Sequence, residues 1–283
     1  LEEGEVQTVD TMIKCITVAS GNDASVAMAE FIAGSEEAFV ARMNARAAEL
    51  GMNNTVFENT NGLDDSVSRH LTSARDIALM SRELIQKHST IRTYTGIWMD
   101  SIRGGEFELS STNKLVYWYP GCTGLKTGST DEAGCCLAAS AERDGMELIS
   151  VTLGSPNTDE RFAAGRKLLD YGFANYSFTE VAANESELSV IPVKKGVART
   201  VTPTVNQTLP LLLQKGDEKH ITQSISMEEE LTAPVKKGDT VGYVHIYLKG
   251  EEIGVIPITA ASDVDKLTYF VCLGRLLKGL FTL

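Results

Sequence analysis

The spacing of apolar residues changes period along this chain, and that change constrains the fold more than any other feature. From Val9 to Ile32 the apolar residues recur at helical spacing, interrupted at Ser20-Gly21-Asn22 by residues that favour turns and helix starts. Further helices are predicted after Ser35 and after Thr72-Ser73, because these hydroxyl side chains are good N-caps. The first third of the chain is therefore predicted to be helical.

The following part of the chain consists of short apolar segments separated by Gly, Pro or Asp turns, a pattern typical of antiparallel strands. The predicted strands are Tyr94–Met99, Glu106–Leu109, Gly124–Lys126, Cys135–Ala141 and Glu147–Leu153. Arg143-Asp144-Gly145-Met146 is a good hairpin turn between the last two. A helix from about Asp159 to Phe173 then follows. Helices followed by a sheet and a packing helix predict an α+β domain.

The composition shifts near Asn175, where alternating Val, Ile and Thr residues begin to predominate. This alternation predicts a small all-β domain. The tail returns to helical spacing, with its apolar residues on one broad face, and it is too short and interrupted to span a bilayer although it can lie on one. The predicted organisation is residues 1–176 as the α+β domain, 177–261 as the β domain and 262–283 as an amphipathic helix.

Charge and cysteine usage exclude several classes of function. The formal net charge of −12 opposes nucleic-acid binding, since a phosphate backbone requires a basic surface. The five cysteines form no Cys-x-x-Cys pair and have no histidines at ligand spacing, so a zinc site is not predicted. We expect no metal or other cofactor.

Two tripeptides carry the chemistry of an acyl-transfer site. Lys126-Thr127-Gly128 combines a positive charge, a hydroxyl donor and a glycine that lets a peptide approach a strand edge. Ser20-Gly21-Asn22 offers a hydroxyl and an amide from a break between helices, although each tripeptide taken alone is a weak signal and Ser-Gly-Asn is more often a helix cap. Their order and their separation of about a hundred residues match the motif set of β-lactamases and penicillin-binding proteins.

The chain resembles the low-molecular-mass penicillin-binding proteins, which are serine-type D-alanyl-D-alanine carboxypeptidases. Residues 1 to about 176 carry the resemblance, and residues 177–283 resemble the C-terminal domain and membrane anchor of the family less specifically. Beyond the two tripeptides, the matching stretches are Leu50-Gly51-Met52, Ser73-Ala74-Arg75-Asp76, Thr112-Asn113-Lys114-Leu115 and Lys167-Leu168-Leu169-Asp170-Tyr171-Gly172-Phe173. The implied fold is a β-lactamase/transpeptidase-like domain.

The resemblance also implies roles for individual residues. Ser20 would relay a proton and Asn22 would bind the substrate amide, while Lys126 and Thr127 would hold the terminal carboxylate of the substrate. Three further residues are implied in substrate binding: Gly128, which keeps the strand edge clear, Ser129, whose backbone N–H would donate to an oxyanion, and Arg161, which would orient the carboxylate. A surface position on a helix is an equally good interpretation of Arg161.

The nucleophile that this family uses, the serine of a Ser-x-x-Lys tetrad ahead of Ser-x-Asn, is not found before Ser20, and the chain opens at Leu1 close to a predicted helix. Ser111-Thr112-Asn113-Lys114 satisfies the pattern by letter, but it follows Ser20-Gly21-Asn22 and leads into a strand-like stretch. We do not interpret it as the nucleophile. The domain is therefore expected to lack its N-terminal part, and the chain itself to be inactive.

By resemblance, the intact enzyme would remove the terminal D-alanine from peptidoglycan pentapeptides through an acyl-enzyme, in cell-wall metabolism, and β-lactams would inhibit it. Its place would be the outer face of the bacterial cytoplasmic membrane, held peripherally by the tail helix. Two alternatives remain: a β-lactamase-like hydrolase, which would need a deacylating acid but no β domain, and a non-catalytic muropeptide-binding or scaffold protein.

Overall fold

The computed structural model describes residues 1–64 and 67–274, and the chain divides into two compact units, Leu1–Asn175 and Tyr176–Leu283. The first unit is the predicted α+β domain, and the second is built from strands. The α-helices of the first unit are α1 (Val9–Thr17), α2 (Asn22–Ala33), α3 (Glu36–Glu49), α4 (Ala74–Lys87), α5 (Arg92–Thr95), α6 (Leu115–Trp118) and α7 (Thr158–Asn175). Its strands are β1 (Met99–Ile102), β2 (Phe107–Ser110), β3 (Cys122–Thr130), β4 (Gly134–Arg143) and β5 (Met146–Ser155).

The helix starts follow the local signals in the sequence. Thr8, Ser35 and Ser73 cap α1, α3 and α4, each with its hydroxyl oxygen accepting an N–H from the first turn of the helix. Gly34, with a φ of 85°, ends α2 in the left-handed conformation that glycine adopts without strain. Helix α1 ends at Thr17 and α2 begins at Asn22, so the break between them lies where the sequence predicts it.

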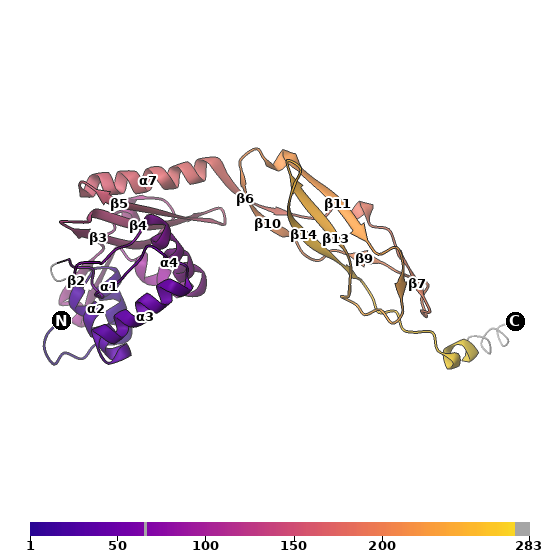
Figure 1. Ribbon diagram of the computed structural model, residues 1–283, viewed down its shortest axis with the longest axis horizontal. Coiled ribbons are helices and arrows are strands. Elements are labelled where there is room, and N and C mark those ends of the chain that lie inside the picture. The colour runs from indigo at the N-terminus through magenta and orange to yellow at the C-terminus, as the bar shows by residue number, and fades with distance from the viewer. Residues whose placement is uncertain (65–66, 275–283) are drawn as a thin grey trace. The chain divides into compact units, whose positions relative to one another are not determined.

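An antiparallel sheet in the order β3-β4-β5 forms the centre of the first unit. Helix α7 packs against one face of this sheet and α4 lies on the other (Figure 1). The buried side chains between α7 and the sheet are Leu115, Tyr119, Leu137, Ala139, Ala141, Phe162 and Leu169. Gly165 permits this close packing, because a Cβ there would lie 2.7 Å from Cδ2 of Leu137. Because the strand order is β3-β4-β5, strand β3, which carries Lys126-Thr127-Gly128, lies at an edge of the sheet.

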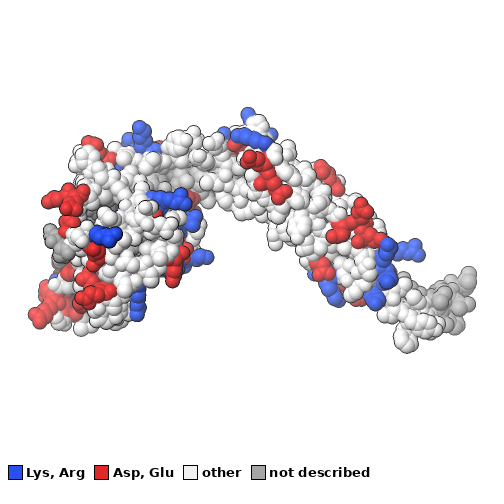
Figure 2. Space-filling model, viewed as in Figure 1, with Lys and Arg blue, Asp and Glu red and all other residues white. Residues whose placement is uncertain are grey.

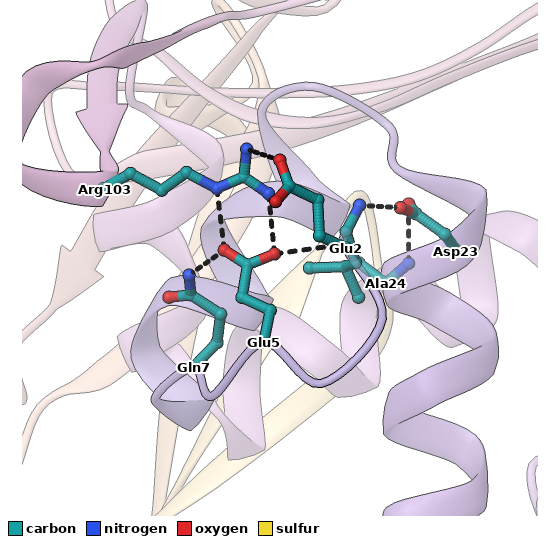
Figure 3. A network of polar contacts seen from close by, with 7 residues as sticks. Glu2, Glu5, Gln7, Asp23, Ala24 and Arg103 are labelled. Carbon is teal, nitrogen blue, oxygen red and sulfur yellow. Dashed lines mark hydrogen bonds and ion pairs between the residues drawn. The ribbon is translucent and has the colours of Figure 1, made fainter.

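Arg103, between β1 and β2, forms hydrogen bonds with the segment that precedes α1. Its guanidinium donates to both carboxylate oxygens of Glu5 and to Glu2, as Figure 3 shows. The hydrogen bonds from Arg103 are the main reason why the pKa of Glu5 falls to about 2. Met12, Cys15 and Ala24 pack together beneath this network and join α1 to α2. These contacts help to fix the end of α1, which leads directly into Ser20.

The second unit has a core of Val, Ile and Ala residues between short sheets. The larger sheet has the order β11-β13-β14-β9, and β6 pairs with β10. The strands are β6 (Tyr176–Val181), β7 (Ile191–Lys194), β8 (Thr200–Val201), β9 (Pro203–Thr204), β10 (Leu209–Gln214), β11 (Ile221–Met227), β12 (Leu231–Thr232), β13 (Thr240–Leu248) and β14 (Glu251–Ala260). The alternation of apolar and polar residues in the sequence matches this architecture.

The structure differs from two of the sequence predictions. A strand was predicted over Tyr94–Met99, but residues 92–95 form helix α5. The hydroxyl of Thr95 donates to the carbonyl of Ile91, four residues earlier, and to the carbonyl of Thr123 on β3, and these contacts stabilise the helical turn. The tail was predicted to be helical from residue 262, yet Val264 is buried and pairs with Val235 in the β unit. A helical segment begins only at Tyr269, and residues 275–283 lie outside the described residues.

On the face in view, the charged side chains lie in several groups, and acidic ones gather at the left edge of the first unit (Figure 2). Figure 2 shows acidic and basic residues interspersed with wide uncharged areas, and no continuous basic area on the face in view of the described part. Within residues 1–64 and 67–274, no helix has both the length and the apolar character needed to cross a membrane. Tyr269 and Phe270 are strongly exposed.

Candidate functional site

One cavity of about 640 Å³ is lined by every residue for which the sequence predicted a role. Its walls come from the α1–α2 break, the loop at residues 59–63, strand β3 and helix α7. The predicted site residues in its lining are Ser20, Asn22, Lys126, Thr127, Gly128, Ser129 and Arg161. The fold thus brings together positions that are up to 141 residues apart, which is the separation of Ser20 and Arg161.

The break between α1 and α2 presents Ser20 to the cavity. Ser20 has a φ of 59°, an uncommon left-handed conformation for a residue other than glycine. The N–H of Gly21 donates to the carbonyl of Cys15 at 2.9 Å, and α2 then begins at Asn22. The chain therefore turns sharply here, and both Ser20 and Asn22 lie in the cavity wall.

Strand β3 carries the cationic side of the cavity. The ammonium of Lys126 donates to the hydroxyl of Ser20 at 2.6 Å and to the carbonyl of Thr127 at 2.7 Å. The hydroxyl of Thr127 donates to that of Thr112 at 2.6 Å. Gly128 faces open space, since a Cβ built there would meet no atom within 4 Å. The edge of β3 is thus accessible from the cavity.

Arg161 lies on α7 and is only 6% exposed. Its Nη1 donates to the carbonyl of Gly128 at 3.1 Å, and its buried Nε has no hydrogen-bond partner in the described part of the chain. Burial lowers the pKa of Lys126 to about 8, and the positive charge of Arg161 contributes to this shift. No described carboxylate forms an ion pair with either cation. The cavity therefore holds one buried cation, Arg161, and one half-buried cation, Lys126, and neither has a counter-ion within the described residues.

The loop at residues 59–63 also lines the cavity, although its residues show no pattern in the sequence beyond that of a turn. Asn59 holds the loop together, since its Nδ2 donates to the carbonyl of Leu63 and its Oδ1 accepts the N–H of Gly62. His70, which precedes α4 in the chain, completes this wall. The neighbouring Asp64 accepts an N–H from Glu132, and Asp65 is outside the described residues.

Ser111 and Lys114 do not form a serine–lysine pair. Ser111 is 8% exposed, and its hydroxyl accepts the N–H of Asn113, which closes a tight turn. Lys114 is exposed. A nucleophilic serine needs a base within hydrogen-bond reach, and no hydrogen bond between these two side chains is found in the described structure. Among the described residues, no three His, Cys, Asp or Glu side chains are grouped so that they could hold a metal ion.

Comparison with known proteins identifies relatives over both units. Residues 1–157 match the family model described as D-alanyl-D-alanine carboxypeptidase, and residues 176–266 match the C-terminal domain of penicillin-binding protein 5. D-alanyl-D-alanine carboxypeptidase DacF of Bacillus subtilis is 39% identical over 279 residues, which are 97% of this chain and 71% of DacF.

Solved structures of two penicillin-binding proteins resemble the chain. Penicillin-binding protein 5 of Haemophilus influenzae has a TM-score of 0.71 at 29% identity, over 94% of this chain and 77% of that one. Penicillin-binding protein D2 of Listeria monocytogenes, solved in a cefotaxime-bound form, has a TM-score of 0.56 at 33% identity, over 59% of this chain and 67% of that one.

Proposed function

The chain belongs to the D-alanyl-D-alanine carboxypeptidase family, and on that basis we propose that its cavity binds the C-terminal D-Ala-D-Ala of a peptidoglycan stem peptide. In this proposal the terminal carboxylate lies between Lys126, Thr127 and Arg161. The intact site would then transfer the acyl group of the penultimate D-alanine to a serine and release the terminal D-alanine. Water would hydrolyse the acyl-enzyme.

The observation that carries this proposal is the unpaired positive charge of the cavity. Lys126 and Arg161 both line it, and no Asp or Glu is found among its described lining residues. Burying a cation without a counter-ion is costly, so a ligand that brings a carboxylate is stabilised there. The planar guanidinium of Arg161 suits a carboxylate, since its N–H groups match the spacing of the two oxygens.

The edge of β3 supplies a second element of recognition. A peptide that pairs along this edge would place its terminal residue beside Gly128, where the absence of a side chain leaves space. We assign the backbone N–H of Ser129 as one donor to the oxyanion of the tetrahedral intermediate. Asn22 would bind the amide of the substrate from the opposite wall.

Ser20 and Lys126 are arranged to move a proton. With its pKa near 8, Lys126 is partly neutral at mildly alkaline pH, and it already contacts the hydroxyl of Ser20. We assign Ser20 as the relay that delivers a proton to the leaving amine. The attacking serine is assigned to a Ser-x-x-Lys tetrad outside residues 1–283, because the one such pattern in the sequence, Ser111–Lys114, is unsuited. By this assignment the chain given binds substrate without turnover.

β-Lactams are proposed as ligands of the same cavity. The Listeria relative, which was solved in a cefotaxime-bound form, shares 33% identity with this chain. The match of residues 176–266 to a penicillin-binding protein domain favours a carboxypeptidase over a β-lactamase. We place the protein at the outer face of the cytoplasmic membrane, where the exposed rings of Tyr269 and Phe270 would contact the lipid surface.

Labelling with a fluorescent penicillin tests the proposal. Residues 1–283 are expected to remain unlabelled, whereas a chain that also contains a Ser-x-x-Lys tetrad ahead of Ser20 is expected to be labelled. Covalent labelling of residues 1–283 would show that the nucleophile lies within them. Failure of the extended chain to become labelled would refute the carboxypeptidase assignment.

A further inference from the structure

A second hollow, which we call the apolar groove, is lined by helices α3 and α4 and by the segment that follows α3. Its volume is about 320 Å³, within the range of small-molecule sites. No Asp or Glu and no uncharged polar side chain is found among its described lining residues. The lining includes two phenylalanines and three methionines: Phe39, Phe57, Met43, Met52 and Met80.

Helical spacing explains how α3 builds one wall of the apolar groove. Phe39, Met43 and Ala47 follow one another at four-residue intervals, so they share one face of the helix. Ala47 and Met52 are each only 3% exposed, which places part of the lining in the packed interior. Methionine side chains are flexible and polarizable, so such a wall adapts to apolar ligands of differing shape.

Two arginines on α3 also line the apolar groove, and they differ in what they already bind. Arg46 forms ion pairs with Glu49 at 2.6 Å and with Glu83 at 2.5 Å, and neither glutamate lines the groove. Arg42 is exposed and donates to the carbonyl of Ile32 at 3.4 Å, without a carboxylate partner in the described part of the chain. Apolar walls beside one uncompensated guanidinium suit a ligand with an apolar body and a carboxylate head.

The apolar groove shares part of its wall with the cavity that contains Lys126, since Met43 and Phe57 line both. The backbone of Phe57 is fixed to α3, because its N–H donates to Oδ1 of Asn44 and its carbonyl accepts from Nδ2 of Asn44, each at 2.8 Å. The ring of Phe57 contacts the imidazole of His70, which lines the cavity, with 5.8 Å between the ring centroids. A ligand packed against Met43 and Phe57 in the groove therefore also contacts the wall of the cavity.

We propose that the apolar groove binds a free single-chain fatty acid, with its alkyl chain against the methionines and its carboxylate on the guanidinium of Arg42. This site is independent of the proposed function. Its effect on the cavity rests on the proposed function: through Met43 and Phe57, an occupied groove changes the affinity of the cavity for a peptide ending in D-Ala-D-Ala. By linkage, the peptide changes the affinity for the fatty acid by the same factor.

Sodium decanoate, used below its micelle-forming concentration, is the probe, and methionine methyl groups report where it binds. The chain has eight methionines, of which Met43, Met52 and Met80 line the apolar groove. In residues 1–283 labelled with ¹³C at the methionine methyls, these three resonances are expected to shift on titration. The resonances of the others are expected to stay nearly unmoved: Met12, Met28, Met99, Met146 and Met227.

The cationic homologue decyltrimethylammonium and one variant test the recognition of charge. Decanoate should bind at least about twofold more tightly than the cation. Arg42→Gln should weaken decanoate about twofold to fivefold, the size of one exposed ion pair, and should not weaken the cation. Arg82→Gln is the matched control, because Arg82 is exposed on α4 and is absent from the lining of the groove.

Peptide titrations with and without saturating decanoate test the effect on the cavity. We expect the affinity for acetyl-Lys-D-Ala-D-Ala to differ by about threefold or more between the two conditions. The reciprocal titration of decanoate, with and without saturating peptide, should give the same factor. The methyl resonance of Met43, which lines both hollows, should respond to either ligand alone.

Several outcomes would refute the fatty-acid site. These are shifts spread evenly over all methionine methyls, no shifts, equal binding of the anion and the cation, or equal effects of Arg42→Gln and Arg82→Gln. Groove shifts that appear on raising the protein concentration alone would assign the groove to a second copy of the chain. Shifts with phosphatidylglycerol vesicles but not with decanoate would assign it to a bilayer, and either result would overturn the proposal.

The same measurements separate the groove from the proposed function. A peptide affinity that decanoate leaves unchanged refutes the coupling and leaves the site standing. If the peptide does not bind at all, the proposed function fails and the coupling fails with it. The methionine shifts then still decide whether the apolar groove binds the fatty acid.

Discussion

The ammonium of Lys126 donates a 2.6 Å hydrogen bond to the hydroxyl of Ser20, which lies 106 residues earlier in the chain. This bond joins the two tripeptides that the sequence singles out. It also crosses the cavity from the edge strand of the sheet to the break between two helices. The two motifs therefore belong to one site.

The affinity for a carboxylate ligand should depend on the protonation of Lys126. Burial, together with the charge of Arg161, lowers its pKa to about 8, so the ammonium is present below that pH and is lost above it. We expect the affinity for a D-Ala-D-Ala peptide to be highest below about pH 8 and to decrease as the pH rises through this value. A bound carboxylate favours the ammonium and moves the midpoint upward.

Lys126→Gln should bind more weakly and should lose this pH dependence. Calorimetric titrations from about pH 6 to about pH 10 measure both effects. Wild-type affinity that stays constant across this range would show that Lys126 does not bind the ligand as a cation.

Arg161→Gln should weaken binding of the peptide by about tenfold or more, because a charge-assisted contact to the carboxylate is removed. Arg166→Gln is the matched control on the same helix, since Arg166 is exposed and is absent from the lining of the cavity. It should change the affinity by about twofold at most. Fluorescence or calorimetric titration distinguishes the two variants, and equal effects would mean that the position of Arg161 in the cavity is irrelevant.

Gly124 and Gly128, both on β3, should respond differently to the same substitution. A Cβ at Gly124 would lie 2.5 Å from Cβ of Thr95, and the φ of 144° is unfavourable for alanine, so Gly124→Ala should destabilise the fold by about 2 kcal/mol. Gly128→Ala should leave stability nearly unchanged, because its Cβ would meet no atom, but should weaken binding along the strand edge. Urea unfolding and ligand titration together check this crossed pattern.

Asp76 should stabilise the first unit in a pH-dependent way. Burial opposes ionisation of this carboxylate, but hydrogen bonds from the hydroxyl of Thr55 and the N–H of Asn54 outweigh burial and keep its pKa below the ordinary value. Its contribution is therefore present above the unfolded-state pKa and is lost as the pH falls through the folded-state pKa. Asp76→Asn should lower the melting temperature at pH 7.

The difference in melting temperature between wild type and Asp76→Asn should shrink as the carboxylate protonates, below about pH 4. Glu37→Gln, an exposed change in the first turn of α3, serves as the control. A difference that stays constant down to low pH would show that the carboxylate of Asp76 acts only through its shape.

The fold of the first unit follows closely from local signals in the sequence. Ser35 and Ser73 are the N-caps that the sequence indicated, and Asp144 and Gly145, both at positive φ, form the predicted hairpin turn. Such features are readable because a cap or a tight turn depends on a few neighbouring residues. The strand predicted at Tyr94–Met99 was wrong because contacts with β3, distant in sequence, decide that segment.

The site was predicted in part. The order of the two tripeptides indicated that Ser20 and Lys126 would meet, and they do. The burial of Arg161 could not be inferred, since most helix arginines are exposed and only the packing of α7 on the sheet covers this one. His70 was missed because a loop has no periodicity that shows which of its residues turn toward a cavity.

The most direct test of carboxylate binding by Lys126 and Arg161 compares one peptide in two forms. Residues 1–283 are titrated with a peptide ending in D-Ala-D-Ala as the free acid and with the same peptide as its C-terminal amide. If Lys126 and Arg161 hold the terminal carboxylate, the acid should bind about tenfold or more tightly than the amide. Equal affinity for the two forms, or no binding of the acid, would contradict the claim that this cavity binds the terminal carboxylate.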